Sequence, residues 1–196
     1  MADMNYKVLI ENAMLNMVRD ILKKISKIVA VANTRLSPSQ LLDVILLKIF
    51  TIMSHTIYHL LHIKTPIDEV FNALTSIEEL KLWYTSEVQG SSKLNEIIEF
   101  KFGGIEFNTR VIELVANKKI VMECVASSLP IVGQQVTYEL DENDDKTRVR
   151  FSQDGFKELD DFYANMNFSA SKYLESLRQY CQKGTSEAFG SMGYRS

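Results

Sequence analysis

The residues of this chain with the most direct capacity for chemistry are three histidines in one short run. His55, His59 and His62 occur within HTIYHLLH. On an α-helix the three imidazoles would share one face and could imitate a metal site, although a structural zinc ion requires four convergent ligands. On a β-strand, His55 and His59 share one face while His62 points to the other. The alternation in HTIYHLLHIKT favours a strand, so we expect no metal ion here.

Clustered carboxylates are the second group of residues that could take part in chemistry. The acidic run ELDENDDKTR lacks the glycine and the bidentate glutamate spacing of a calcium loop, so we expect a solvated hairpin tip. The pairs Glu78–Glu79 and Asp160–Asp161 stand at predicted helix starts, where the helix dipole stabilises carboxylates. No nucleophile elbow, phosphate-binding glycine loop or Cys–His pairing at a recognisable spacing is present. The sequence therefore shows no catalytic machinery and implies no cofactor.

Composition limits the class of protein and its partners. The 196 residues are 46% hydrophobic and carry a formal net charge of -3, which fits a globular domain and gives no reason to expect nucleic acid as a partner. Cys124 and Cys181 are the only two cysteines, so we expect no disulfide framework and a reducing cytosol. The N-terminus lacks the arrangement of a secretory signal, and the most apolar window, Leu41 to Met53, is too short to span a bilayer. We therefore expect a cytoplasmic protein without a membrane span.

The element that must position any site is a long amphipathic segment near the C-terminus. From about Lys157 to Lys183, apolar residues recur at steps of three and four, which predicts a helix with one apolar face, and Gly184 is expected to end it. Before this helix, turn signals such as Gly103–Gly104 separate several strands. Two short helices follow the first strand, and Ser76 is expected to cap the second in a capping box with Glu79. This order predicts an α+β fold in which an antiparallel sheet wraps the terminal helix.

The first 52 residues are expected to form a helical extension. Asn5 to Ile28 has apolar residues at helical spacing, and Ser37 with Pro38 predicts a second helix start. Two interpretations stay open: the extension packs on the main domain or on a second copy as a homodimer, or it is a remnant fused before an independent domain. The run YKVLIENAMLNMVRDILKKI resembles the first helix of the bacterial stringent starvation protein B adaptors, where that helix contributes to dimerisation. Nothing after Lys27 continues that pattern, so peptide delivery is not inferred.

A second resemblance covers most of the chain, residues 54–189. The segments IKTPIDEVFNALTSIEELKLWYT, FKFGGIEFNTRVIELVANKKIVME and VRFSQDGF, followed by NFSASKYLESLRQYCQKGTSEAF, occur in an order that resembles the SRPBCC superfamily of START-like, helix-grip domains. The nearest branch is the one related to the C-terminal domain of the activator of the cytosolic heat-shock chaperone ATPase. This resemblance implies a curved antiparallel sheet gripping the terminal helix, with a cavity opening near the two short helices. The helix-grip domain would then span 53–189, followed by a disordered tail over 190–196.

Aromatic and aliphatic side chains are the candidates for a ligand site in such a cavity. Each one alone is explained as a core residue, but ligand pockets are mostly apolar with a few placed polar groups. We expect Trp83 and Tyr84 at the cavity mouth, and Arg110, Glu123 and Tyr138 are candidates to orient a polar end of the ligand. The predicted ligand-binding residues are Trp83, Tyr84, Phe100, Phe102, Phe107, Arg110, Met122, Tyr138, Phe151, Met166 and Tyr173.

Three functions follow from these observations. The first is non-catalytic binding of a hydrophobic or amphipathic small molecule between sheet and helix. The second is a protein-interaction module of the chaperone-activator type, which an exposed apolar patch would favour. The third is a cyclase- or hydratase-like enzyme that uses the same cavity, which buried acid–base pairs would favour.

Overall fold

The computed structural model describes residues 54–194, which form a seven-stranded sheet with three helices. All pairs of neighbouring strands are antiparallel, and the order across the sheet is β1-β7-β6-β5-β4-β3-β2. The elements in chain order are β1 (His55–Ile63), α3 (Ile67–Thr75), α4 (Ile77–Trp83), β2 (Glu87–Gly90), β3 (Ile97–Phe102), β4 (Ile105–Val115), β5 (Lys119–Ser127), β6 (Gln135–Asn143), β7 (Lys146–Phe156) and α5 (Asp161–Lys183).

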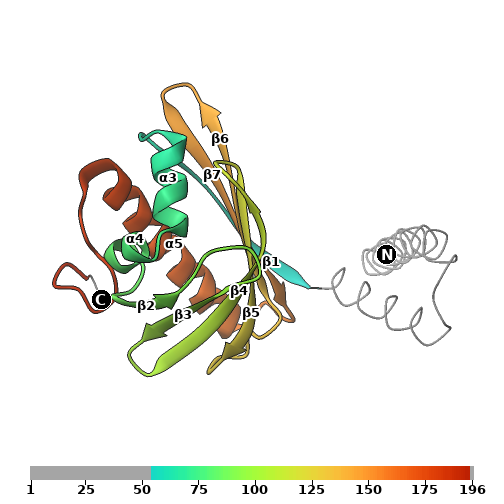
Figure 1. Ribbon diagram of the computed structural model, residues 1–196. Coiled ribbons are helices and arrows are strands. Elements are labelled where there is room, and N and C mark those ends of the chain that lie inside the picture. Colours follow the sequence, from blue (N-terminus) through green and yellow to red (C-terminus); the bar gives the residue numbers. More distant parts are fainter. Residues whose placement is uncertain (1–53, 195–196) are drawn as a thin grey trace, which may run out of the picture. The chain divides into compact units, whose positions relative to one another are not determined.

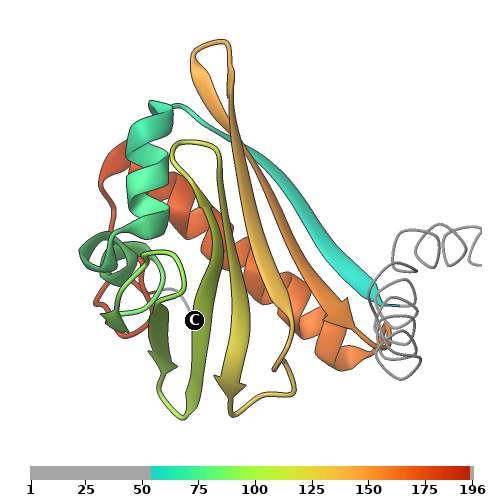
Figure 2. The same cartoon turned by 45° about the vertical axis from the view of Figure 1, so that its right-hand side comes forward.

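The predicted α+β helix-grip architecture is confirmed. Figures 1 and 2 show α5 lying along one face of a curved sheet, with α3 and α4 at one end. The structure adds β2, which was not predicted because only Val88 of its four residues is buried and the segment has no apolar periodicity. The predicted helical extension over 1–52, the adaptor-like helix within it and the pairing through it lie outside the described residues.

Strand β1 confirms the assignment of the histidine run to a strand. Ile57 and Ile63 are fully buried, whereas Tyr58 and Leu60 between them are 75% and 60% exposed. His59 is half-buried on the inner face and His62 is exposed. The period of two arises because successive side chains of a strand point to opposite faces. The three imidazoles are therefore divided between two faces.

Helix α4 begins as predicted, but its capping box is only half correct. The Ser76 hydroxyl accepts a hydrogen bond from the backbone N–H of Glu79 at 3.4 Å, as an N-cap should. The Glu79 carboxylate was expected to serve the same helix start. Instead it accepts a hydrogen bond from the Tyr180 hydroxyl of α5. Tyr180, which is distant in sequence, thus binds the Glu79 carboxylate that the local pattern assigns to the N-terminal cap of α4.

The terminal helix begins four residues later than predicted. Asp160 is the N-cap, and its Oδ1 accepts a hydrogen bond from the backbone N–H of Tyr163 at 2.8 Å. Leu159 therefore precedes the helix and is 66% exposed, although its spacing assigns it to the apolar face. Gly184 ends the helix with φ 66°, as predicted.

Buried and partly buried hydrogen bonds tie α5 to the helical corner and, through Thr65 after β1, to the sheet. The Ser176 hydroxyl donates to the carbonyl of Trp83 at 2.7 Å, and the Trp83 indole donates to the carbonyl of Ala73 at 2.8 Å. The Thr65 hydroxyl donates to the carbonyl of Cys181 at 2.9 Å, and the Thr147 hydroxyl donates to the carbonyl of Thr65 at 2.8 Å. Because a buried polar group without a partner is costly, these bonds specify one placement of the C-terminal half of α5.

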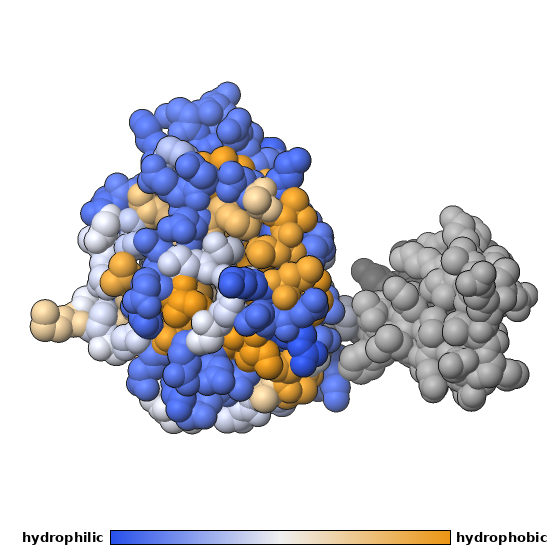
Figure 3. All heavy atoms as spheres, viewed as in Figure 1, coloured by the Kyte–Doolittle hydropathy of each residue, from blue (hydrophilic) through white to orange (hydrophobic). Residues whose placement is uncertain are grey.

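The acidic run at the β6–β7 hairpin is more ordered than a solvated tip. The turn contains only Asp144 and Asp145, and the rest of the run lies in the two strands. Asp141 lies within β6 and pairs with Arg148 and Arg150 of β7 at 2.7 and 2.9 Å. Hydrogen bonds from the Arg148 guanidinium hold the pKa of Asp141 well below its usual range. This end of the hairpin remains strongly hydrophilic, as the top of Figure 3 shows.

The buried contact between α5 and the sheet predicts a clear difference between two leucines. Leu177 is fully buried, so Leu177→Ala should lower the free energy of unfolding by about 2–5 kcal/mol. Leu159→Ala is the matched control and should change it by less than about 0.5 kcal/mol, because that side chain is exposed. Urea unfolding of both variants measures the difference. Equal losses would contradict the placement of the helix start at Asp161.

Candidate ligand-binding cavity

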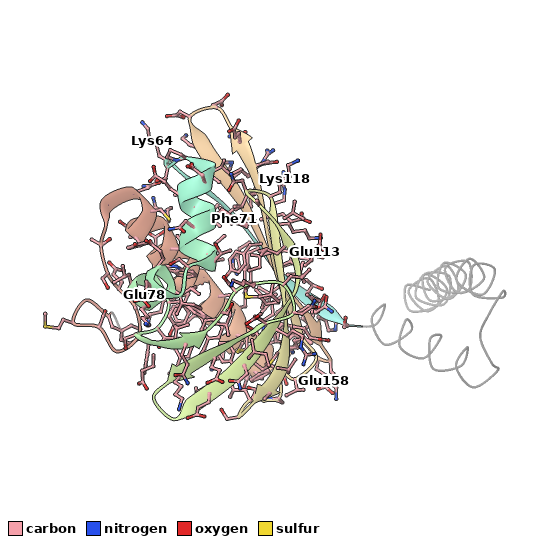
Figure 4. All side chains as sticks on the ribbon, viewed as in Figure 1. Lys64, Phe71, Glu78, Glu113, Lys118 and Glu158 are labelled. Atoms are coloured by element: carbon pink, nitrogen blue, oxygen red, sulfur yellow. The ribbon has the colours of Figure 1, made fainter. Side chains whose placement is uncertain are left out.

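A cavity of about 410 Å³ lies between the inner face of the sheet, α5 and the helical corner. Its walls are mainly aromatic and aliphatic, and no Asp, Glu, Lys, Arg or His is among the residues that line it. Figure 4 shows the labelled charged residues on the outside of the domain, whereas Phe71 of α3 lies toward the interior. The lining residues are Leu74, Leu80, Trp83, Tyr84, Phe100, Phe102, Ile105, Phe107, Thr109, Met122, Leu129, Val136, Tyr138, Phe151, Gln153, Phe162, Asn165, Met166, Ser169, Ala170, Tyr173, Phe189 and Tyr194.

The structure brings together ten of the eleven predicted ligand-binding residues around this cavity. They are Trp83, Tyr84, Phe100, Phe102, Phe107, Met122, Tyr138, Phe151, Met166 and Tyr173. Arg110 does not line the cavity: it is exposed and lies opposite Glu123 in the β4–β5 register. Because Thr109 faces inward, strand alternation turns Arg110 outward. Binding of a ligand by the ten residues remains a prediction.

Trp83, one of the two residues predicted at the mouth, is not among the exposed residues of the cavity wall. Trp83 is only 1% exposed and its indole is bonded to a backbone carbonyl, so it belongs to the closed part of the wall. The exposed lining residues are Ile105, which is 40% exposed, and Asn165. Leu129, beside them in the loop after β5, is half-buried. The most exposed part of the cavity wall is therefore at the β3–β4 turn, the β5–β6 loop and the first half of α5.

An aromatic cluster forms the wall between the helical corner and β3. Tyr84 ends α4, and its ring meets Phe100, Phe102 and Tyr173 edge-on, with centroid distances of 5.3, 5.1 and 4.9 Å. Phe107 stacks on Phe100 and Phe102 at 5.1 and 5.7 Å. Such aromatic pairs add stability beyond their buried area, so this wall is preorganised.

The segment after α5 supplies two lining residues that the sequence reasoning missed. Phe189 pairs with the chain after α4: its N–H donates to the carbonyl of Tyr84 at 3.0 Å, and its carbonyl accepts from Ser86 N–H at 2.9 Å. Tyr194 accepts a hydrogen bond from Lys172 Nζ at 2.8 Å, and this ammonium lies 4.0 Å from the Tyr194 ring centroid. A tail over 190–196 was expected to be disordered, whereas the structure places 190–194 against the domain.

Glycine spacing is the signal that could have revealed this tail. A Cβ at Gly190 would lie 2.5 Å from the Ser86 hydroxyl oxygen, and its φ is 80°, so a side chain there would prevent the close approach. The sequence FGSMGY places aromatic residues at both ends of this glycine-containing segment.

Few polar groups reach the cavity, and they differ in how their hydrogen bonds are satisfied. Gln153 Nε2 donates to Gln134 Oε1 at 2.9 Å. The Thr109 hydroxyl is buried and has no hydrogen-bond partner among the described residues. Burial raises the pKa of Tyr84 and of Tyr138, so both phenols stay protonated near neutral pH. The lining offers hydroxyl and amide groups for recognition but no acid–base pair.

Within residues 54–194, no group of three or more His, Cys, Asp and Glu side chains is arranged to hold a metal ion. The buried Nε2 of His59 has no hydrogen-bond partner among these residues, but His59 does not line the cavity. No helix in this part of the chain has both the length and the apolarity to cross a bilayer.

Comparison with known proteins places the geometry in a family. The model of the family described as "Activator of Hsp90 ATPase homolog 1-like protein" matches residues 64–182. The solution structure of the Aha1 dimer from Colwellia psychrerythraea is 28% identical, with a TM-score of 0.63 over 66% of this chain and 98% of that chain. A search of curated proteins finds no match.

More distant solved structures share the fold. A protein from Mesorhizobium loti is 19% identical, with a TM-score of 0.58 over 64% of this chain and 95% of that chain. A protein from Staphylococcus saprophyticus is 16% identical, with a TM-score of 0.58 over 68% of this chain and 97% of that chain.

The buried phenols predict how stability depends on alkaline pH. Burial raises the pKa of Tyr138 above the ordinary value of 10.0, so the folded state disfavours the phenolate. The contribution of the buried, protonated Tyr138 phenol to folding stability is fully present below about pH 10. It is lost as the pH rises above that value. Tyr138→Phe should therefore lose less stability than the wild type between about pH 9 and about pH 11.

Chemical unfolding across this pH range measures, for each protein, the slope of the free energy of unfolding against pH. Tyr58→Phe is the matched control, because it removes a phenol that is 75% exposed, and it should keep the wild-type slope. The burial of Tyr138 would be disproved by identical slopes for Tyr138→Phe and the wild type.

Proposed function

Because the chain belongs to the family of activator of Hsp90 ATPase homolog 1-like proteins, we propose that its helix-grip domain binds an uncharged, largely apolar small molecule between the sheet and α5. The observation that carries this proposal is the composition of the cavity wall. It combines a dense aromatic cluster with a complete absence of charged residues. The proposed role is binding without catalysis.

The size of the cavity supports a small-molecule occupant. A volume of about 410 Å³ falls within the range of roughly 300–1,000 Å³ that is typical of ligand pockets. The mouth beside Ile105, Leu129 and Asn165 gives the ligand access from solvent. Apolar ligand surface transferred into this space is removed from water, which supplies the driving force for binding.

The electrostatics of the wall support a neutral occupant. Burying an ionised carboxylate or ammonium is strongly unfavourable unless an opposite charge accompanies it. No lining residue supplies such a charge, and Arg110, the one cation among the predicted ligand-binding residues, faces away. A fatty acid or a sulfonate is therefore a poorer ligand than an uncharged molecule of similar size.

A second candidate function is stimulation of a chaperone ATPase. It rests on the family description and on the 28% identity to the Aha1 dimer structure. Tyr58 and Leu60 on the outer face of the edge strand β1 are 75% and 60% exposed, which provides an apolar surface for a protein partner. An ATPase assay with an Hsp90-type chaperone tests this candidate: stimulation by the wild type that Leu60→Ser lowers would support it, and no stimulation would exclude it.

Self-association is part of the same set of proposals. The similar Colwellia structure is described as a dimer, and we propose that this chain also forms a homodimer. Native mass spectrometry of the full chain measures the subunit number and detects any co-purifying small molecule in the same experiment. A monomer at micromolar concentration would contradict this proposal.

Filling the cavity should weaken binding of a neutral dye. Ala170 of α5 lines the cavity, so Ala170→Phe should weaken the binding of Nile red at least about tenfold. Ala164→Phe is the matched control, because Ala164 is an exposed residue of the same helix, and it should bind Nile red as the wild type does. Fluorescence titration measures both affinities, and thermal unfolding confirms that the variants are folded.

The choice of dye tests the charge argument separately. The anionic dye 1-anilinonaphthalene-8-sulfonate should bind the wild type at least about tenfold more weakly than Nile red. Tighter binding of the sulfonate would contradict the proposal of a neutral ligand. Unchanged Nile red binding by Ala170→Phe would contradict the cavity as the site.

A further inference from the structure

We infer that the side-chain amide oxygen of Gln153 recognises the ligand, so that the preferred ligand is an uncharged, largely apolar molecule that carries a hydrogen-bond donor such as a hydroxyl or N–H group. This inference rests on the proposed function and names the chemical class of the ligand for the same cavity. It follows from a buried amide whose nitrogen is bonded to the protein and whose oxygen is left for another partner.

Gln153 lies on the inner face of β7 and lines the cavity. Val149, Phe151 and Gln153 are buried, whereas the residues between them are more exposed, as strand alternation requires. Gln153 is only 6% exposed, and its neighbours across the strands are Ile57 of β1 and Val136 of β6. Neither side chain can form a hydrogen bond. An apolar residue would fill this place without burying an amide, so packing alone does not account for glutamine here.

Gln134 fixes the orientation of this amide. Its Oε1 accepts a hydrogen bond from Gln153 Nε2 at 2.9 Å. The backbone N–H of Gln134 donates to the carbonyl of Ile131 at 3.0 Å, and its carbonyl accepts from the N–H of Cys124 at 2.9 Å. A Cβ at Gly155, whose φ is 90°, would lie 3.1 Å from Gln134 Cγ, so the glycine lets the Gln134 side chain lie close to β7. Gln134 is therefore a positioning residue for the amide of Gln153.

The amide oxygen of Gln153 has no protein partner and remains accessible. Within residues 54–194, the only side-chain hydrogen bond of Gln153 is the one through Nε2. Two unpaired side-chain atoms of this part have essentially no accessible surface, His59 Nε2 and the Thr109 hydroxyl oxygen, and the Gln153 oxygen is not one of them. Because Gln153 is otherwise buried and lines the cavity, the accessible surface of its oxygen faces the cavity. A ligand atom can therefore reach this oxygen.

The surroundings of the oxygen suit a ring with one polar substituent. Phe151 lies two positions away on the same face of β7, which places it about 6.6 Å from Gln153. Tyr138 meets the Phe151 ring edge-on at 5.2 Å, and both rings line the cavity. A ligand ring packed on these two residues brings a substituent at its edge to Gln153. Because an amide oxygen accepts hydrogen bonds and cannot donate them, that substituent must be a donor.

A matched pair of neutral molecules, 2-naphthol and 2-methylnaphthalene, tests this inference. They differ by a hydroxyl in place of a methyl group. Gln153→Met keeps the length of the side chain and removes the amide, so it should weaken the binding of 2-naphthol about fivefold and leave 2-methylnaphthalene unchanged. Gln135→Met is the matched control, because the neighbouring Gln135 does not line the cavity, and it should change neither affinity. Equilibrium dialysis with the full chain measures all of these affinities.

A second variant tests the role of the positioning residue. Gln134→Met leaves the amide of Gln153 in place but removes the acceptor at 2.9 Å that orients it. It should weaken 2-naphthol binding by a smaller factor than Gln153→Met does, again without an effect on 2-methylnaphthalene. Thermal unfolding confirms that both variants are folded. A merely structural role of the glutamine pair would instead weaken both molecules by the same factor, and that result would overturn the inference.

A third molecule, 2-acetylnaphthalene, tests the direction of the hydrogen bond. Its carbonyl can accept a hydrogen bond but has no hydrogen to donate. Gln153→Met should therefore leave its affinity unchanged. Weaker binding of 2-acetylnaphthalene together with unchanged binding of 2-naphthol would overturn the assignment of the Gln153 oxygen as the recognition atom.

The outcomes separate the inference from the proposed function. If 2-naphthol and 2-methylnaphthalene bind the wild type and Gln153→Met changes neither affinity, the inference is overturned while cavity binding stands. If Nile red, 2-naphthol and 2-methylnaphthalene all fail to bind the wild type, the proposed function fails, and the inference fails with it.

Discussion

The attachment of α5 at its two ends is the constraint on which the cavity depends. Near its C-terminus, Ser176 and Cys181 bond to Trp83 and Thr65, and Leu177 is fully buried. Near its N-terminus, the Tyr163 hydroxyl donates to the carbonyl of Thr56 in β1 at 3.3 Å. The residues between these attachments, including Met166 and Ala170, line the cavity. A helix held at both ends can span a curved sheet without packing against it along its whole length.

The interior of this domain combines rigidity with two buried polar atoms, His59 Nε2 and the Thr109 hydroxyl, that have no hydrogen-bond partner among the described residues. Edge-on and stacked aromatic contacts around Tyr84 and Phe107 preorganise the wall, which reduces the entropy lost on binding. The unpaired Thr109 hydroxyl is buried behind this wall, at a cost to folding stability. Strained or unsatisfied features of this kind tend to occur at functional sites.

The segment after α5, which is not part of the helix-grip elements, completes the wall of the cavity. Phe189 is held by two backbone hydrogen bonds to Tyr84 and Ser86, and its ring packs on Phe102 at 5.5 Å. Tyr194 is held through Lys172 of α5. This tail therefore connects the same helix and the same aromatic wall that define the cavity. Family membership establishes the fold, whereas the chemistry of the site is carried by such individual contacts.

Local patterns in the sequence determined the order of all elements except β2, the strand assignment of β1, the Ser76 and Gly184 caps and ten of the twenty-three residues that line the cavity. These features depend on neighbours within a few residues or on side-chain alternation, which a single sequence contains. The tertiary structure alone decided the partner of Glu79, which is Tyr180 at a separation of 101 residues. It also decided the burial of Trp83, the docking of Phe189 and the unpaired state of Thr109. Those properties depend on which distant segments meet, and no local periodicity records that information.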